Sequence, residues 1–316
     1  MYHTNNINFN LSFTLEKIFT EFKSKRAIQF NNKNFIKYSD LKKLIDNICS
    51  YLLKFEFNNN SLIFIEGHKS FETYALILSC LSVGLPYALI DPEIPKKRLN
   101  KIINKHKPIF FYLNKIELKK NNNIYLKKNF SKKKYKRINN FKQKFIKSTD
   151  TAYIMFTSGS TGDPKAAIMS HNNLINFINW SINTYNFSKN EKILNLNAIY
   201  FDNSVFDIYS SFFSGSCLIP VTTNDVNNHK ILKEIIIKNK CTSWFSVPSL
   251  ILYLNKFKFF DDTKTFNSLK RIIFGGEGMP LSKLNSIYKI HKKKLKFYNV
   301  YGPTECTCIC SSYQIN

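Results

Sequence analysis

The chain has 316 residues, of which 44% are hydrophobic and 15% aromatic, so it can bury a core for one large domain or two smaller ones. Its formal net charge of +26 raises the question of nucleic acid, but only four of its 47 basic residues are arginine, and lysine is spread along the whole chain. No helix with clustered arginine is predicted, nor a sheet with interleaved aromatic and basic residues, so we expect no nucleic-acid partner and interpret the lysines as solvated.

The first half of the chain alternates between helical and strand patterns. Apolar residues at helical spacing predict a helix over 41–52, with Ser39 or Asp40 as its N-cap. Three further elements follow: a buried strand within 61–67, a helix over 71–82 and a strand over 87–90. The apolar stretch 74–90 approaches the length of a membrane span, but a glycine and a proline interrupt it, so we predict a buried helix and strand and no membrane partner.

A polar, lysine-rich segment over 119–147 separates this half from the next and is predicted to be an exposed connector with weak strand content. The alternation then resumes. Helices are predicted over 229–240, 248–257 and 281–290, and strands within 241–247, 269–277 and 296–305. Strands that alternate with helices predict an α/β fold, in which helices pack on mostly parallel sheets.

The cysteines bear on both compartment and metal binding. Their number is seven, and the N-terminal sequence lacks the charged start and apolar stretch of a signal peptide, so we expect a reduced, cytoplasmic protein. Cys306, Cys308 and Cys310 alternate in the sequence ECTCIC, which predicts three buried thiols on one side of a strand. A metal site would need a fourth ligand and a more typical spacing.

Residues 157–165, TSGSTGDPK, follow a predicted strand and carry the residue types of a phosphate-binding loop. Gly159 and Gly162 let the backbone turn tightly, so that successive N–H groups converge on an anion, and Lys165 adds a positive charge. The spacing is not that of the Walker loop, which would place the lysine directly after the second glycine. On these residues alone, a phosphate loop and an ordinary turn both stay open.

A series of segments, in a fixed order, resembles the motifs of the adenylate-forming (AMP-binding) enzyme superfamily. They are IKYSDLKKLIDNICSYL, LSVGLPYALIDPEIPKKRLNKII, TSGSTGDPK, FDNSVFDIYSSFFSGS, FGGEGMP and NVYGPTEC. Within that superfamily the chain looks most like the amino-acid adenylation domains of peptide synthetases and the D-alanine–carrier protein ligases. The resemblance covers residues 12–316 and implies one adenylation domain, the large N-terminal α/β domain of these enzymes without their small C-terminal domain.

The resemblance implies that ATP and an amino acid react to an aminoacyl-adenylate and pyrophosphate, and that the aminoacyl group then passes to the phosphopantetheine thiol of a carrier protein. Two anions must meet in this reaction, so backbone dipoles, a lysine and Mg²⁺ should offset their charge. The implied catalytic residues are Thr157, Lys165 and Glu305, of which Glu305 also binds the metal. The implied nucleotide-binding residues are Ser158, Gly159, Ser160, Thr161, Gly162, Gly276, Glu277, Tyr301, Gly302 and Thr304.

Asp202, in the segment FDNSV, determines the substrate class that the resemblance implies. In the amino-acid-activating branch the matching aspartate pairs with the α-ammonium group, which needs an ionic partner in a closed pocket. The alternative interpretation of Asp202 is an N-cap for the following helix. The other implied substrate-binding residues are Asn203, Phe206, Ser246, Ile273, Gly275, Val300, Cys308 and Ile309. Gly275 leaves open a position that a side chain fills in enzymes for small residues, which points to a medium-sized substrate.

Two features depart from the family pattern. Ala166 stands where the family usually has glycine. The sequence also ends just past NVYGPTEC, before the family's TGD segment, hinge and C-terminal lysine. The chain is therefore expected either to work with a separate C-terminal half or to be a non-catalytic remnant, and an acyl-CoA ligase of the same superfamily is the enzymatic alternative. Binding of an aminoacyl-adenylate analogue should survive better than turnover, because the missing lysine acts mainly in the transition state.

Overall fold

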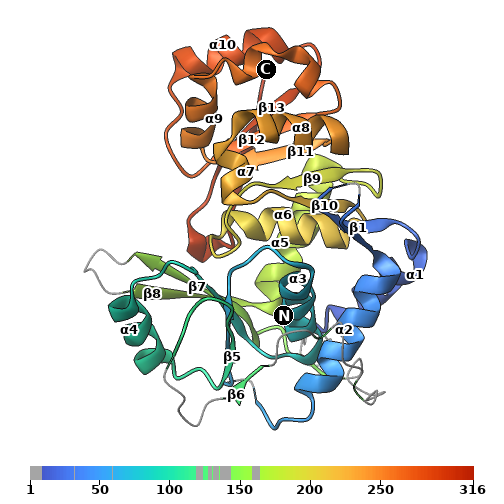
Figure 1. Cartoon of the computed structure of the whole chain (residues 1–316), viewed down its shortest axis with the longest axis vertical. Coiled ribbons are helices and arrows are strands. Elements are labelled where there is room, and N and C mark those ends of the chain that lie inside the picture. The colour runs from blue at the N-terminus through green and yellow to red at the C-terminus, as the bar shows by residue number, and fades with distance from the viewer. Residues whose placement is uncertain are drawn as a thin grey trace, which may run out of the picture. The chain divides into compact units, whose positions relative to one another are not determined.

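The computed structural model describes residues 9–31, 33–58, 60–118, 124–126, 130, 135, 144–158 and 164–316. The chain forms two compact units: unit 1 consists of residues 1–23 and 38–177, and unit 2 of residues 24–37 and 178–316. Each unit contains one mostly parallel sheet with helices, shown in Figure 1. The predicted α/β class is therefore confirmed.

Unit 1 is built on a six-stranded sheet in the order β6-β5-β3-β4-β7-β8. All neighbouring strands are parallel except β7 and β8, which form an antiparallel pair. The strands are β3 (Ile63–Glu66), β4 (Tyr87–Ile90), β5 (Phe110–Tyr112), β6 (Ile124–Tyr125), β7 (Thr151–Ser158) and β8 (Pro164–Ser170). The helices are α1 (Ser12–Glu21), α2 (Tyr38–Leu52), α3 (Phe71–Val83), α4 (Lys96–His106) and α5 (His171–Tyr185), within which the boundary to unit 2 falls. β3 and β4 are buried along their whole length, as central parallel strands should be.

The apolar stretch 74–90 forms the predicted buried helix and strand. Ser70 caps α3 by accepting a hydrogen bond from the Thr73 backbone N–H at 3.1 Å, and Gly84 ends the helix in the left-handed conformation at φ 67°. No helix in the described part of the chain is long and apolar enough to cross a bilayer. The predicted helix over 41–52 is also confirmed, but it begins at Tyr38, directly after strand β2 (Phe35–Lys37). Its expected caps, Ser39 and Asp40, therefore lie inside the first turn.

Unit 2 is built on an eight-stranded sheet in the order β14-β13-β12-β11-β9-β10-β1-β2, which is parallel except at its two ends. The strands are β1 (Arg26–Gln29), β2 (Phe35–Lys37), β9 (Lys192–Asn195), β10 (Cys217–Pro220), β11 (Ser243–Ser246), β12 (Arg271–Gly275), β13 (Lys296–Tyr301) and β14 (Ser311–Ile315). The helices are α6 (Asn203–Phe213), α7 (Thr223–Asn227), α8 (His229–Asn239), α9 (Pro248–Asn255) and α10 (Leu281–His291), with 3₁₀ turns η3 (Phe259–Asp261), η4 (Thr263–Phe266) and η5 (Thr304–Cys306). Trp244, Phe259 and Phe260 pack in the core of this unit.

Two other sequence predictions have different outcomes. The connector over 119–147 lies mostly outside the described residues, and its described part includes the short strand β6, parallel to β5. The predicted strand through the three alternating cysteines is wrong. Thr307 and Cys308 have φ values of 62° and 83°, and β14 begins only at Ser311, so the extended backbone that alternation requires is absent there.

Candidate functional site

The predicted site residues fall in both units, and those of unit 1 lie on the β7–β8 pair. Thr157 is half-buried and pairs in register with the exposed Lys165, while Ser158 pairs with Pro164. The two strands therefore hold the ends of the predicted phosphate loop side by side. Gly159, Ser160, Thr161 and Gly162 lie outside the described residues.

In unit 2, Asp202 and Thr304 are in direct contact. Thr304 lies in η5, after β13, and its Oγ1 donates a hydrogen bond to Asp202 Oδ2 at 2.5 Å. Asp202 occupies the N-cap position of α6, yet its side chain makes no capping hydrogen bond there. The alternative interpretation of Asp202 as a helix cap is therefore not supported, because the carboxylate faces Thr304 instead.

The surroundings of Asp202 favour a cation. Burial is the largest effect and raises the pKa of this carboxyl, and the nearby carboxylate of Glu305 raises the pKa further. The hydrogen bond from Thr304 lowers the pKa but does not reverse the net upward shift. A positive group bound beside Asp202 would relieve both effects. Glu305 itself is exposed.

Asn203 and Cys308 lie on the same side of unit 2 as Asp202. The Cys308 thiol lies 3.9 Å from Asn203 Oδ1, and burial, followed by the charges of Asp202 and Asp207, raises its pKa well above the ordinary value. Gly276 has φ 89°, and a side chain built there would approach Asn203 Nδ2 at 4.0 Å. The structure thus brings together four predicted site residues from three separate segments of the sequence: Asp202 and Asn203, Gly276, and Cys308.

Most of the other predicted substrate-binding side chains are enclosed. Phe206 is fully buried and packs edge-on against Tyr185 and Phe245, with ring centroids 5.3 and 5.1 Å apart. The Ser246 hydroxyl accepts a hydrogen bond from Trp244 Nε1 at 2.8 Å. Three further predicted substrate-binding residues are also buried: Ile273, Val300 and Ile309.

Gly275 does not border an open space. It pairs with Val300 across β12 and β13, and a Cβ atom placed on it would lie 2.1 Å from the Val300 carbonyl oxygen and 2.6 Å from Val300 Cγ2. The close approach of two strands therefore requires this glycine, and the expectation of a medium-sized substrate loses its physical basis.

We expect the substitution Gly275→Ala to destabilise the chain by about 3 kcal/mol, because backbone atoms of β13 would have to move. The matched control is Gly278→Ala, since a Cβ atom there meets nothing within 4 Å. That control should stay within about 0.5 kcal/mol of the parent in urea denaturation. Equal stability of the two variants would contradict the close approach at Gly275.

The remaining predicted nucleotide-binding residues lie near the ends of β12 and β13. Glu277 is exposed, and its Oε2 accepts a hydrogen bond from the Ser249 backbone N–H at 3.0 Å in the first turn of α9. Tyr301 is 67% exposed, so its ring is free to stack on a flat ligand. Gly302 packs against the backbone of the cysteine segment, where a Cβ atom would lie 2.4 Å from the Cys308 carbonyl oxygen.

The three cysteines of this segment differ in exposure. Cys306 and Cys310 are exposed and Cys308 is buried, as are Cys49, Cys80, Cys217 and Cys241. Burial raises the pKa of each of these five buried thiols, so their reactive thiolate is scarce. No group of three or more metal-ligating side chains occurs among the residues that the structure describes.

An Ellman titration of the native chain should therefore detect two reactive thiols, and the same titration in guanidinium should detect all seven. Replacing Cys306 and Cys310 with serine should abolish the native reaction. Reaction of a third thiol at the same rate would show that Cys308 is not enclosed as the structure has it.

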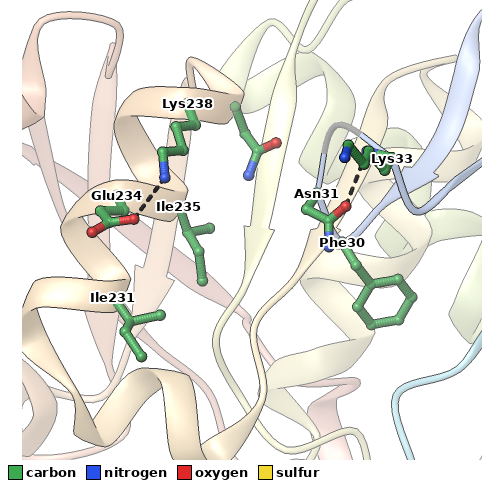
Figure 2. A pocket seen from close by; sticks show the side chains of 8 residues that line it. Phe30, Asn31, Lys33, Ile231, Glu234, Ile235 and Lys238 are labelled. Carbon is green, nitrogen blue, oxygen red and sulfur yellow. Dashed lines mark hydrogen bonds and ion pairs between the residues drawn. The ribbon is translucent and has the colours of Figure 1, made fainter.

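A surface pocket of about 320 Å³ in unit 2 is not part of this site. It lies between the β1–β2 connection and α8, and Phe30, Ile231 and Ile235 form its apolar lining (Figure 2). Lys238 pairs with Glu234 across 2.7 Å at its edge. None of the predicted site residues lines this pocket, so its size alone does not identify a functional site.

The sequence analysis did not identify a polar cluster formed by Asp207, Asn195 and Asn197. Asp207, one turn further along α6 than Asp202, is fully buried, and its Oδ2 accepts hydrogen bonds from Asn195 Nδ2 at 3.0 Å and Asn197 Nδ2 at 3.2 Å. The signal was present as a carboxylate inside the apolar helix sequence SVFDIY, preceded by two asparagines at the end of a strand. A buried carboxyl group of this kind needs hydrogen-bond partners nearby.

The chain has an α/β fold in which the candidate site residues of unit 2 follow the ends of parallel strands. Asp202 follows β9, Gly276 follows β12 and Thr304 follows β13. Such an arrangement is typical of enzymes with an α/β fold. The chain belongs to the AMP-binding enzyme family, which matches residues 15–316.

Two curated relatives illustrate the family. An L-proline–[L-prolyl-carrier protein] ligase of Pseudomonas fluorescens is 26% identical over 298 residues, which cover 90% of this chain and 59% of the relative. A D-alanine–D-alanyl carrier protein ligase of Listeria welshimeri is 29% identical over 294 residues, which cover 89% of this chain and 56% of the relative. The chain thus spans somewhat over half the length of these relatives.

Solved structures agree on the fold. The N-terminal subdomain of Klebsiella oxytoca NpsA, in complex with 3-hydroxyanthranilyl-AMSN, matches with a TM-score of 0.84 at 18% identity. The match covers 98% of this chain and 76% of that chain. The predicted fold, the large N-terminal domain of an adenylate-forming enzyme, is therefore confirmed.

Proposed function

We propose that this chain binds ATP and an amino acid and forms the aminoacyl-adenylate, from which the aminoacyl group then passes to a carrier-protein thiol with release of AMP. The observation that carries the proposal is the half-buried carboxylate of Asp202, which Thr304 holds beside Glu305 in unit 2. A half-buried carboxylate with a raised pKa is a suitable partner for an α-ammonium group and a poor neighbour for an acyl chain. The prolyl and D-alanyl ligases among its relatives support an amino-acid substrate.

The proposed chemistry joins the substrate carboxylate to the α-phosphorus of ATP and releases pyrophosphate. Lys165 and the loop between β7 and β8 would bind the β- and γ-phosphates, and the exposed Tyr301 ring would stack on the adenine. Gly276 and Glu277 would line the nucleotide through their backbone, because the Glu277 side chain already binds the first turn of α9. Asp202 would orient the amino acid through its ammonium group.

The exposed carboxylate of Glu305 fits the needs of Mg²⁺. This ion binds proteins through one or two carboxylates and takes its other ligands from water and substrate phosphate. A single exposed carboxylate, without a cluster of further acidic ligands among the described residues, matches that pattern. When bound, Mg²⁺ would offset the phosphate charge. We also propose that a carrier protein accepts the aminoacyl group.

The direct test measures binding and turnover separately. Sulfamoyl-adenosine analogues bearing alanyl or prolyl groups mimic the adenylate, and at a hundredfold excess over Kd the better one should raise the free energy of unfolding by about 2.7 kcal/mol. Analogues that replace these groups with propionyl or cyclopentanecarbonyl lack the ammonium group and should bind more weakly. ATP–pyrophosphate exchange with the same amino acids tests catalysis. Equal binding of amino and des-amino analogues would refute an amino-acid substrate and favour an acyl ligase.

A further inference from the structure

The segment that carries Asp202 is held at both of its ends by side chains of α6. This segment, residues 196–202, connects β9 to α6 and contains neither helix nor strand. At its start, Asn197 Nδ2 lies 3.2 Å from Asp207 Oδ2 and 3.2 Å from the Phe245 carbonyl oxygen of β11. Asn195, the last residue of β9, donates to the same Asp207 oxygen at 3.0 Å. Asp207 therefore fixes the start of the segment to the helix.

The end of the segment is fixed by Ser204. Its Oγ lies 2.8 Å from the Ile199 carbonyl oxygen and 2.7 Å from the Phe201 carbonyl oxygen, and its single proton can be donated to either. The Ser204 and Val205 backbone N–H groups bond to the carbonyl oxygens of Phe201 and Asp202 at 3.0 and 2.9 Å. Because α6 packs against β9, β10 and β11, these bonds fix the position of the segment relative to the sheet of unit 2.

Asp202 takes part in this arrangement through its backbone carbonyl oxygen. Its carboxylate makes no capping bond to α6 and instead accepts from Thr304. The position of the carboxylate is therefore set by the bond from Thr304 and by the backbone that precedes Asp202, and that backbone is held by Asp207 and Ser204. A group that binds a substrate needs this kind of support from residues behind it.

We propose that Asp207 is a positioning residue: through Asn195, Asn197 and the segment 196–202, it holds Asp202 where a substrate ammonium group can pair with it. This inference rests on the proposed function. A carboxylate at position 207 is suited to the task, since one oxygen accepts from two amide groups at once. Asparagine at position 207 keeps the shape and one oxygen for the two amide groups, but an amide oxygen is a weaker acceptor than a carboxylate oxygen. Asparagine would leave the segment less firmly attached.

The experiment compares two affinities in each variant of the 316-residue chain. The probes are alanyl- and propionyl-sulfamoyl-adenosine, together with the prolyl and cyclopentanecarbonyl pair, and the quantity is the ratio of Kd for the des-amino probe to Kd for the amino probe. The parent chain should prefer an amino probe by about 100-fold, as expected for an ammonium group bound to a carboxylate. In Asp207→Asn the ratio should fall to about 10 or below, while Kd for the des-amino probe changes less than about threefold.

Ser210→Ala is the matched control for loss of a buried hydrogen bond in the same helix. The Ser210 hydroxyl donates to Ser181 Oγ at 3.0 Å, away from the segment, so this variant should lose stability but keep the parent ratio. Asn197→Ala is a second test of the same link and should lower the ratio in the same way as Asp207→Asn. It replaces Asp207→Asn in the comparison if that variant does not fold. Loss of stability alone cannot mimic the result, because both probes are measured on folded protein.

The outcomes separate this inference from the proposed function. A parent chain that binds both probes equally refutes the amino-acid substrate and with it any role of Asp207 in positioning Asp202. A parent chain that prefers the amino probe, with Asp207→Asn and Asn197→Ala keeping that preference, overturns only the positioning role. A collapsed ratio in both variants, with Ser210→Ala unchanged, supports it.

Discussion

Replacing Asp202 with asparagine should weaken the binding of an aminoacyl-sulfamoyl-adenosine about 100-fold and leave the binding of its des-amino counterpart almost unchanged. The amide keeps a hydrogen-bond acceptor near Thr304 but removes the charge that would pair with the ammonium group. Isothermal titration of both probes gives the two values. Asp261→Asn, an exposed aspartate in η3, is the control and should bind both probes as the parent does.

The same charge should make binding depend on pH. The pKa of Asp202 is raised, because burial and the charge of Glu305 disfavour the ionised form. Lowering the pH from 7 towards this raised pKa should therefore protonate Asp202 and weaken the amino probe, whereas the Asp202→Asn variant should show no such loss. A parent chain whose binding is independent of pH between 7 and 4 would argue that Asp202 does not face the ligand.

Much of the fold could be predicted because local pattern and tertiary structure agree. The strand over 87–90 and the helix before it form as expected, since Ser70 and Gly84 mark the helix ends and the apolar residues between them are buried. The helix over 41–52 was predicted with its start too late, because Tyr38 enters the helix directly from β2 and no separate cap residue is needed.

The arrangement of the candidate site was less accessible to sequence reasoning. The contact between Asp202 and Thr304 joins residues 102 positions apart, and no local pattern encodes that distance. The alternating cysteines misled because left-handed backbone at Thr307 and Cys308 carries no clear signal in residues other than glycine. Gly275 shows the same limit: the sequence reveals the absence of a side chain, but only the strand pairing shows that Val300 fills the space.

Replacing Glu191 with glutamine should reduce the free energy of unfolding by about 3 kcal/mol at pH 7, because it leaves a buried guanidinium without its charge partner. Glu191 precedes β9, and its carboxylate lies 3.1 Å from Arg271 Nη1 and 2.7 Å from Lys270 Nζ at the start of β12. Glu191 and Arg271 are both buried, so water screens this pair little. The ion pair links two strands that are separated by β11 in the sheet.

The control for this substitution is Glu234→Gln, which breaks an exposed pair with Lys238 and should cost less than about 0.5 kcal/mol. Both variants would be compared with the parent by urea denaturation. If Glu191→Gln lowers the free energy of unfolding no more than Glu234→Gln does, the buried ion pair adds no net stability. Its attraction would then only offset the cost of removing the two charged groups from water.

The pH dependence of this difference follows from the same carboxylate. Burial raises the pKa of Glu191, but the hydrogen bonds from Lys270 and Thr242 and the charge of Arg271 outweigh burial and hold the pKa below its ordinary 4.5. A lowered folded-state pKa contributes stability that is fully present above pH 4.5 and is lost as the pH falls through the folded-state value. The stability difference between parent and Glu191→Gln should therefore be constant from pH 7 to about 5 and shrink below that, as protonation makes the parent resemble the variant. A difference that stayed constant to pH 3 would mean that the carboxylate contributes through packing rather than charge.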